Sequence, residues 1–286
     1  MRLGLLLIPT DPWHRAVARA REIEDMGFDH LWTYDHLSWR RFRDQPWFGA
    51  TTWLAGIAAS TSRIRLGTMV TSPNFRDPVV LAKEAMTLDH ISAGRLTLGV
   101  GAGGIGFDAT VLGQPVLSPA QRVDRLTDFL QVLDGLLTQP TFSAQNAHYS
   151  VVEARMLPGC VQQPRLPLAI AAGGPRTMRL AATYGDAWVT DAHQGSPGEL
   201  EAAMTAQLRM LDRACDLTGR QVDTRIMLVA NSFGRPLADL DDFTRFYDWC
   251  EALGFTDLVL HDPRPDDPIW DDDPRVVEQI AARYLA

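Results

Sequence analysis

The chain has 286 residues, of which 46% are hydrophobic and 22% charged, the composition of an ordinary globular protein that is long enough for one large α/β barrel or two smaller domains. Its net charge of -8 argues against nucleic acid or an anionic membrane surface as the main partner. Three widely spaced cysteines (Cys160, Cys215 and Cys250) predict neither a disulfide framework nor a metal site, and they fit a reduced cytoplasmic setting.

Short apolar runs alternate with longer segments of helical period along the whole chain. The runs predict eight buried strands, at residues 3–8, 30–34, 64–69, 96–100, 168–172, 187–190, 226–230 and 257–261. The longer segments predict eight helices, at residues 13–26, 49–60, 78–91, 119–137, 175–184, 198–217, 240–253 and 274–284. The first run, 3–8, is too short to span a membrane and lacks a signal-peptide cleavage pattern.

Helix boundaries carry the expected signals. Asp77 and Asp273 each precede a proline, as N-caps do, while Gly27 and Gly254 stand where C-terminal caps belong. Eight strand–helix units predict a (β/α)8 TIM barrel formed by residues 1–286 as one domain. The alternative, a doubly wound open sheet, requires a glycine-rich turn after the first strand, where this chain has the proline-flanked residues 9–12.

Two segments interrupt the regular spacing. Residues 38–48 form a long loop after the second strand and carry Trp39, Trp47 and three arginines. Residues 139–163 form an irregular insertion between the fourth helix and the fifth strand, with turn signals typical of a hairpin. Loops of this length in a compact barrel are often functional, and the aromatic residues favour a function.

The ends of the third and fourth strands are the most informative positions. The segment from Leu66 to Pro73 and the segment from Gly94 to Gly103 each run from a strand into a loop rich in Gly, Ser and Thr. Ligands bind at the carboxyl ends of parallel strands, so these two segments predict where the active face lies.

Other strand ends carry titratable or small residues. Asp35 and His36 follow the second strand, and His193 and His261 follow later strands, where a histidine is more often a structural hydrogen-bonding residue than a catalytic one. Gly173 and Gly174 follow the fifth strand and precede a helix that starts at Pro175. Exposed N–H groups at that helix start, beside Arg176, predict a phosphate-binding turn.

These motifs resemble the bacterial luciferase-like monooxygenase superfamily, and in particular its coenzyme F420-dependent oxidoreductases. The resemblance rests on four segments in the right order: Gly27 to His36, Leu66 to Pro73, Gly94 to Gly103, and Ala171 to Pro175. It covers residues 1 to about 190. It implies a TIM barrel that binds a flavin or deazaflavin at the carboxyl ends of its strands.

The resemblance also implies roles for individual residues. Asp35 and His36 would contact the deazaflavin ring. His36 would donate or accept a proton, and Asp35 would either orient His36 or form a hydrogen bond with the ring. A cis peptide at Met69-Val70 would back the ring, and Gly101 and Gly103 would leave room beside it. The remaining implied cofactor-binding residues are Thr71, Ala102, Ala172, Gly173, Gly174, Pro175 and Arg176. The substrate side would be walled by Trp39, Trp47 and Phe107.

Two departures limit what the resemblance implies. Gly104 stands where sugar-phosphate dehydrogenases of this branch have an acidic residue, and Trp39 lies one residue closer to the Asp-His pair than usual. A sugar-phosphate dehydrogenase with that acid catalyst is therefore not expected, and the substrate is not identified.

Three functions remain open. The first is hydride transfer between coenzyme F420 and a small organic substrate. The second is an FMN-dependent two-component monooxygenase, which would need a partner flavin reductase. The third is a flavin-binding barrel without turnover. Members of the superfamily are commonly dimers, so the resemblance also implies a homodimer.

Overall fold

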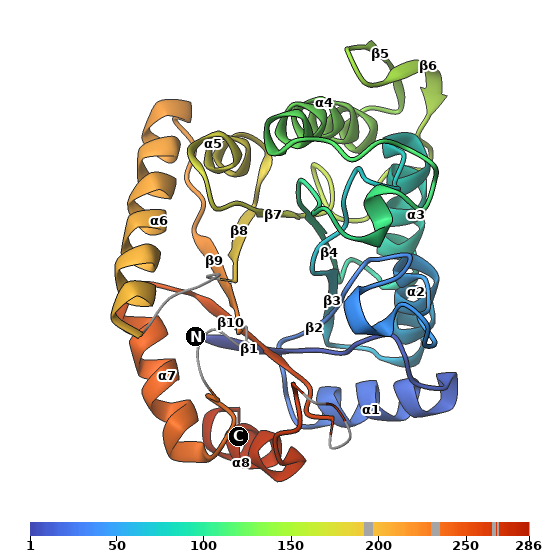
Figure 1. Ribbon diagram of the computed structural model, residues 1–286. Helices are drawn as coiled ribbons and strands as arrows, with labels where there is room; N and C mark the ends of the chain where they lie inside the picture. Colours follow the sequence, from blue (N-terminus) through green and yellow to red (C-terminus); the bar gives the residue numbers. More distant parts are fainter. Residues whose placement is uncertain (192–196, 230–234, 265–266, 268, 286) are drawn as a thin grey trace.

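The computed structural model describes residues 1–191, 197–229, 235–264, 267 and 269–285. Its centre is a closed barrel of eight parallel strands, seen end-on in Figure 1. The strands, in their order around the barrel, are β1 (Arg2–Leu6), β2 (His30–Thr33), β3 (Arg65–Thr68), β4 (Leu96–Val100), β7 (Leu168–Ala171), β8 (Ala187–Thr190), β9 (Thr224–Leu228) and β10 (Asp257–His261). The predicted TIM barrel is confirmed.

Helices surround the barrel on the outside (Figure 1). The α-helices are α1 (Trp13–Asp25), α2 (Ala50–Ser60), α3 (Pro78–Ile91), α4 (Pro119–Thr138), α5 (Pro175–Tyr184), α6 (Pro197–Thr218), α7 (Leu240–Ala252) and α8 (Pro274–Tyr284). The predicted caps are confirmed: Asp77 accepts hydrogen bonds from the backbone of Val79 and Val80, and Asp273 accepts one from Arg275. Two short 3-10 helices, η1 (Arg40–Phe42) and η2 (Phe107–Ala109), lie in loops after β2 and β4.

The predicted insertion is an antiparallel hairpin of β5 (Thr141–Gln145) and β6 (Ser150–Arg155). It lies outside the barrel, beyond α4 and α3 in Figure 1. The Lys83 ammonium on α3 donates to the backbone carbonyl of Arg155 at 2.8 Å, which attaches the hairpin to the helical layer. Although the hairpin lies between β4 and β7 in the chain, these two strands pair directly and the barrel is closed.

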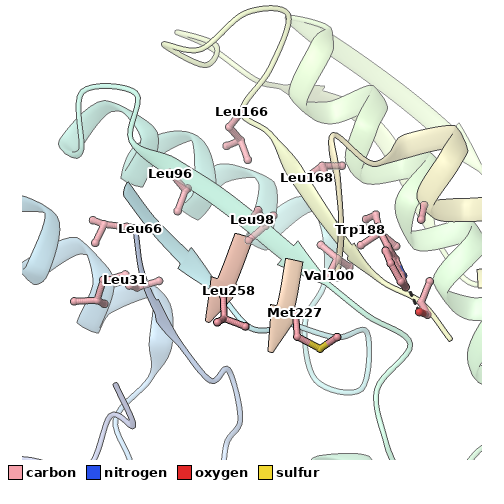
Figure 2. Packing of buried hydrophobic residues seen from close by; sticks show 14 of the residues in the cluster. Leu31, Leu66, Leu96, Leu98, Val100, Leu166, Leu168, Trp188, Met227 and Leu258 are labelled. Carbon is pink, nitrogen blue, oxygen red and sulfur yellow. Dashed lines mark hydrogen bonds between the residues drawn. The ribbon is translucent and has the colours of Figure 1, made fainter. Parts of the chain in front are cut away.

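Alternate residues of most barrel strands pack into two separate apolar clusters. On β2, Leu31 faces the helices while Trp32 lies in the barrel interior, and on β9 Met227 faces the helices between Ile226 and Leu228. Figure 2 shows the helix-facing layer, which also contains Trp188. This period of two is the pattern that a closed sheet filled by its own side chains requires.

Glycines make room for large side chains inside the barrel. A Cβ on Gly67 would lie 2.3 Å from the Trp32 ring, and one on Gly4 would lie 1.7 Å from the His30 ring. Trp32 in turn donates its indole N–H to His30 at 2.7 Å. Gly67 of the third-strand motif therefore serves packing.

No helix in the described part of the chain is long and apolar enough to cross a membrane. The apolar run at residues 3–8 contains strand β1. All three cysteines are buried and free. Residue 230, the predicted end of the seventh barrel strand, and His193 lie outside the described residues.

Candidate active site

Four neighbouring strand ends form the candidate site. The order β2-β3-β4-β7 around the barrel places the loops after these strands side by side at the carboxyl edge. Thr71, just beyond β3, forms a parallel bridge with Val100 at the end of β4. The segments that carried the resemblance therefore lie next to one another in space.

The loop after β3 has the geometry that the resemblance implies. The peptide bond between Met69 and Val70 is cis. Met69 is buried and its backbone N–H donates to Thr33 of β2 at 2.8 Å, while Thr71 donates its N–H to Gly99 of β4 at the same distance. The Thr71 hydroxyl is buried and has no hydrogen-bond partner among the described residues.

Gly101 and Gly103 lie in close contact with the loop after β3. A Cβ on Gly101 would lie 2.8 Å from a Val70 methyl group, and one on Gly103 would lie 2.7 Å from the Asn74 amide. Gly103 also has a φ of 75°, a conformation that favours glycine. Both glycines therefore accommodate the loop after β3, and the room that they were expected to leave beside a ring stays a prediction.

Asp35 is turned away from His36. Both of its carboxylate oxygens accept from the guanidinium of Arg76, at 2.9 and 2.7 Å, and its side chain is fully buried. Burial alone would lower the pKa of Arg76, but the bond to Asp35 outweighs it and the pKa is raised. Because Arg76 binds both carboxylate oxygens, Asp35 braces the loop after β3 and does not orient His36.

Asp108 holds the imidazole of His36. One carboxylate oxygen accepts from His36 Nδ1, and the other accepts the backbone N–H of Leu37 at 2.8 Å. The Asp108 side chain is 7% exposed and that of His36 is 27% exposed. Since Nδ1 is bound by a buried carboxylate, Nε2 is the ring atom left to contact a ligand.

Aromatic side chains surround His36. Its ring stacks on Trp39 with centroids 5.8 Å apart and lies 6.0 Å from Trp47, whose indole N–H donates to the His36 carbonyl at 2.8 Å. Phe107, next to Asp108, lies under the Arg43 guanidinium. The structure thus brings together His36 and the three residues expected to wall the substrate side.

The aromatic cluster extends to the far side of the barrel mouth. Trp270, in the connection between β10 and α8, stacks on Trp39 at 5.9 Å and on His261 at 4.2 Å. Tyr34 donates its hydroxyl to His261 Nε2 at 2.7 Å, and His261 Nδ1 donates to the Val229 carbonyl. Burial raises the pKa of Tyr34, and the charge of Asp191 adds to this shift. His261 is therefore a buried structural residue, the more common role for such a histidine.

The predicted phosphate-binding turn is open. A Cβ on Gly173 or Gly174 would meet no atom within 4 Å, and Gly174 is the N-cap of α5. Arg176 is bound to Asp124 of α4 and does not point freely into this space. Ala172 is buried and accepts the indole N–H of Trp188. The backbone of this turn therefore presents the start of α5 to solvent beside Ala172.

These features fit a flavin or deazaflavin. The buried Thr71 hydroxyl lacks a partner in the described part of the chain, so a ring heteroatom at the strand ends would satisfy it. The unobstructed turn at Gly173 and Gly174 suits a phosphate. No group of three or more metal-ligating side chains occurs among residues that the structure describes.

Several residues that complete the site, among them Asp108 and Asn74, were not predicted. Asp108 lies four positions after Gly104, so the site has an acidic group although the expected position lacks one. Asn74 donates to the Gly104 carbonyl at 3.0 Å and is itself bound by Arg125. Asp108 could have been predicted as a site residue, because it is the first carboxylate after the glycine-rich loop.

A family model and the sequences of known proteins both match this chain. The family model of luciferase-like monooxygenases matches residues 2–229. An F420-dependent glucose-6-phosphate dehydrogenase of Kineococcus radiotolerans is 29% identical over 267 residues, which are 93% of this chain and 77% of that protein. A 4-hydroxyprotoasukamycin monooxygenase of Streptomyces nodosus is 33% identical over 239 residues, 80% of this chain and 62% of that protein.

The fold is also found among solved structures. An F420-dependent secondary alcohol dehydrogenase, in complex with an F420–acetone adduct, superposes with a TM-score of 0.81 at 17% identity, and the match covers 99% of each chain. At that identity the likeness concerns the fold alone. The family match covers most of the chain and includes the ends of β2, β3, β4 and β7. The chain belongs to the luciferase-like monooxygenase family.

Proposed function

We propose that the protein is a coenzyme F420-dependent oxidoreductase that moves a hydride to or from a small organic substrate. The observation that carries the proposal is the His36–Asp108 pair, which joins the loops after β2 and β4 at the carboxyl edge of the barrel. Relatives named as F420-dependent dehydrogenases, about 30% identical to this chain, support it. We further propose that residues 1–286 act as a single domain.

Each strand end has a distinct part in this proposal. Met69, Val70 and Thr71 would lie against the ring, together with Ala102 and its neighbours Gly101 and Gly103. Ala172, Gly173, Gly174, Pro175 and Arg176 would hold the phosphate end, with the N–H groups at the start of α5 as donors. Asp35 would act indirectly, by fixing the loop after β3 through Arg76.

His36 would move the proton that accompanies hydride transfer. When bound, the deazaflavin supplies the carbon that accepts or donates the hydride. For oxidation of an alcohol, the substrate carbon loses a hydride and its hydroxyl loses a proton, which His36 accepts at Nε2. The Asp108 carboxylate stabilises the imidazolium that results. Trp39, Trp47 and Phe107 would exclude water from this exchange.

Absorbance titration of the protein with coenzyme F420 tests the proposal. We expect saturable binding that Gly174→Asp weakens at least tenfold, because a carboxylate at the start of α5 repels a phosphate. Gly198→Asp is the matched control, since Gly198 lies in the first turn of α6 and is equally unobstructed. Equal binding by the Gly174 variant and the wild type would contradict the phosphate assignment.

The second candidate is an FMN-dependent monooxygenase supplied with reduced flavin by a partner reductase. The 33% identical monooxygenase relative favours it specifically. Oxygen uptake with reduced FMN and a flavin reductase, together with failure to bind F420, would establish this candidate in place of the first. A barrel that binds cofactor without any turnover is the third possibility, and reduction of bound cofactor by any substrate would exclude it.

We also propose a homodimer that works in the cytoplasm. The three buried, free thiols fit a reducing compartment. Sedimentation velocity at micromolar concentration would measure the oligomeric state directly, and a monomer over that range would contradict the dimer.

A further inference from the structure

Large apolar side chains are exposed in the two loops that carry His36 and Asp108. Their exposed fractions range from 45% to 73%. The residues are Leu37 in the loop after β2 and Ile105, Val111, Leu112 and Val116 in the loop after β4. Single exposed apolar residues are ordinary on a protein surface, but several of them in one place mark a site that binds an apolar molecule. We call these five residues the apolar collar.

The apolar collar is connected directly to the His36–Asp108 pair. Leu37 follows His36, and its backbone N–H donates to Asp108 at 2.8 Å. In the other loop, the backbone N–H of Val111 donates to the carbonyl of Phe107 at 2.9 Å, which fixes the turn after η2 next to Asp108. Both loops of the collar are therefore held at one carboxylate, beside the residue proposed to exchange a proton with the substrate.

The loop after β4 presents no free charge to a ligand. Asp108 is the only charged residue between positions 101 and 118. Its carboxylate is buried and is bound by His36 and by the backbone N–H groups of Leu37 and Ser38. A phosphate or carboxylate on a substrate would meet no cation of this loop, and Asp108 would repel it.

Two arginines of the loop after β2 lie nearby, and both are placed over aromatic rings. The Arg40 guanidinium lies 4.8 Å from the centroid of the Trp39 ring, and that of Arg43 lies 4.4 Å from the centroid of Phe107. Both arginines are exposed, so water and salt screen their attraction for an anion. The surface nearest His36 is therefore aromatic, and the surface beyond it is the apolar collar.

We propose that the substrate is an uncharged alcohol, or the carbonyl compound formed from it, with an apolar body long enough to reach from His36 to the apolar collar. The inference rests on the proposed function. On oxidation, the hydroxyl proton passes to His36 Nε2 and the adjacent carbon loses a hydride to the coenzyme, which leaves the carbonyl compound. The apolar body covers side chains that otherwise stay in contact with water, and this burial favours binding.

Binding of 2-alkanols, from 2-butanol to 2-nonanol, to the full chain without coenzyme tests the inference. The readout is the change in tryptophan fluorescence. We expect the affinity to rise about twofold to fourfold with each added methylene group, because each one covers further apolar surface. Ile105→Gln combined with Leu112→Gln should reduce the ratio of the 2-nonanol affinity to the 2-butanol affinity at least fivefold.

Leu217→Gln is the matched control, since Leu217 is an exposed leucine on α6, outside both loops. It should leave the ratio of affinities unchanged. Steady-state kinetics with the coenzyme provide the second readout, in which kcat/KM should rise along the same series. Glucose 6-phosphate, the substrate in the names of two relatives, is the charged comparison and should give a lower kcat/KM than 2-nonanol.

Several outcomes would overturn the inference. These are an affinity that does not rise with chain length, an equal loss in the Leu217 variant, and a higher kcat/KM for glucose 6-phosphate. Binding to phosphatidylglycerol vesicles that the double variant loses would assign the collar to a membrane surface, and dissociation of a dimer in that variant would assign it to a second copy. Failure to bind coenzyme F420 would contradict the proposed function instead, while the alkanol affinities would still support or overturn the role of the collar.

Discussion

The Nδ1 atom of His36 donates a hydrogen bond to the carboxylate of Asp108, a residue 72 positions later in the chain. Asp108 reaches this position because η2 begins directly after the loop that Asn74 holds at Gly104. The carboxylate also accepts backbone N–H groups of Leu37 and Ser38. One buried acid therefore fixes both the imidazole and the backbone that follows it.

We expect Asp108→Asn to lower kcat about tenfold to a hundredfold, with less than a threefold change in coenzyme affinity. The amide keeps the size of the side chain but removes the charge that stabilises protonated His36. General acid–base catalysis contributes about 10²- to 10⁴-fold, and the variant should lose the part of it that depends on this charge. Steady-state kinetics and absorbance titration measure the two quantities.

A matched control for this variant exists on the hairpin side of the molecule. His148 is bound to Asp128 at 2.7 Å, a second histidine–aspartate pair remote from β2. Asp128→Asn should leave kcat unchanged. A similar loss of activity in both variants would show that the Asp108 effect is a general consequence of losing such a pair.

Arg76→Gln should lower the free energy of unfolding by about 3–5 kcal/mol, because it leaves the Asp35 carboxylate buried without its ion-pair partner. Adding Asp35→Asn should restore a substantial part of that stability. Urea denaturation measures each variant. Arg235→Gln, which removes an exposed guanidinium from its ion pairs, should have little effect on stability. Additive losses in the double variant would contradict the pairing argument.

Protonation of Glu24 should lower the free energy of unfolding at acid pH. Burial by itself would raise the pKa of Glu24, but backbone N–H bonds from Arg63, Ile64 and Ser62 outweigh it and lower the pKa to about 2. Because the folded-state value lies below the ordinary 4.5, this stabilisation is complete above about pH 5 and is lost as the pH falls toward 2.

The measurement compares the wild type with Glu24→Gln in thermal unfolding between pH 7 and pH 3. The difference in stability should be largest at pH 7 and should shrink below pH 5. Glu153→Gln is the control, since Glu153 is exposed and lies on the hairpin. A wild-type–variant difference that stays constant over the whole pH range would contradict the assigned shift.

Gly67→Ala should destabilise the barrel by about 1–3 kcal/mol, since the new methyl group would lie 2.3 Å from the Trp32 ring and force that ring to move. Gly106→Ala is the control, because a Cβ there meets nothing within 4 Å. Denaturant unfolding followed by tryptophan fluorescence compares the two. If Gly67→Ala were as stable as Gly106→Ala, the Trp32 ring would be able to move aside at no cost, which would contradict the packing argument.

The barrel could be predicted because its signals are local. Apolar runs, the caps at Asp77 and Asp273, and Gly27 and Gly254 with φ of 91° and 88° all follow from residues near in sequence. The site was predicted only in part. His36 and Trp39 are close in sequence, but the partners Asp108 and Arg76 come from other loops, and the direction of Asp35 depends on where Arg76 lies.

Position alone does not show what occupies the space around a glycine. Gly101 and Gly103 follow a strand end, as ligand-binding glycines do, yet Val70 and Asn74 fill the space beside them. Gly173 and Gly174 have the same sequence signal, and the space beside them is open. The difference arises from contacts between separate strand ends, which composition and spacing do not encode.

The loop after β3 is bonded to both neighbouring loops, through Arg76 to Asp35 after β2 and through Asn74 to Gly104 after β4. Three loops that would otherwise move independently are therefore held in one arrangement before any ligand arrives. Their conformational entropy is lost during folding, so little of it remains to oppose binding. A ring that enters this site should bind with a small entropic penalty from the protein, and its affinity should reflect mainly the contacts that it makes.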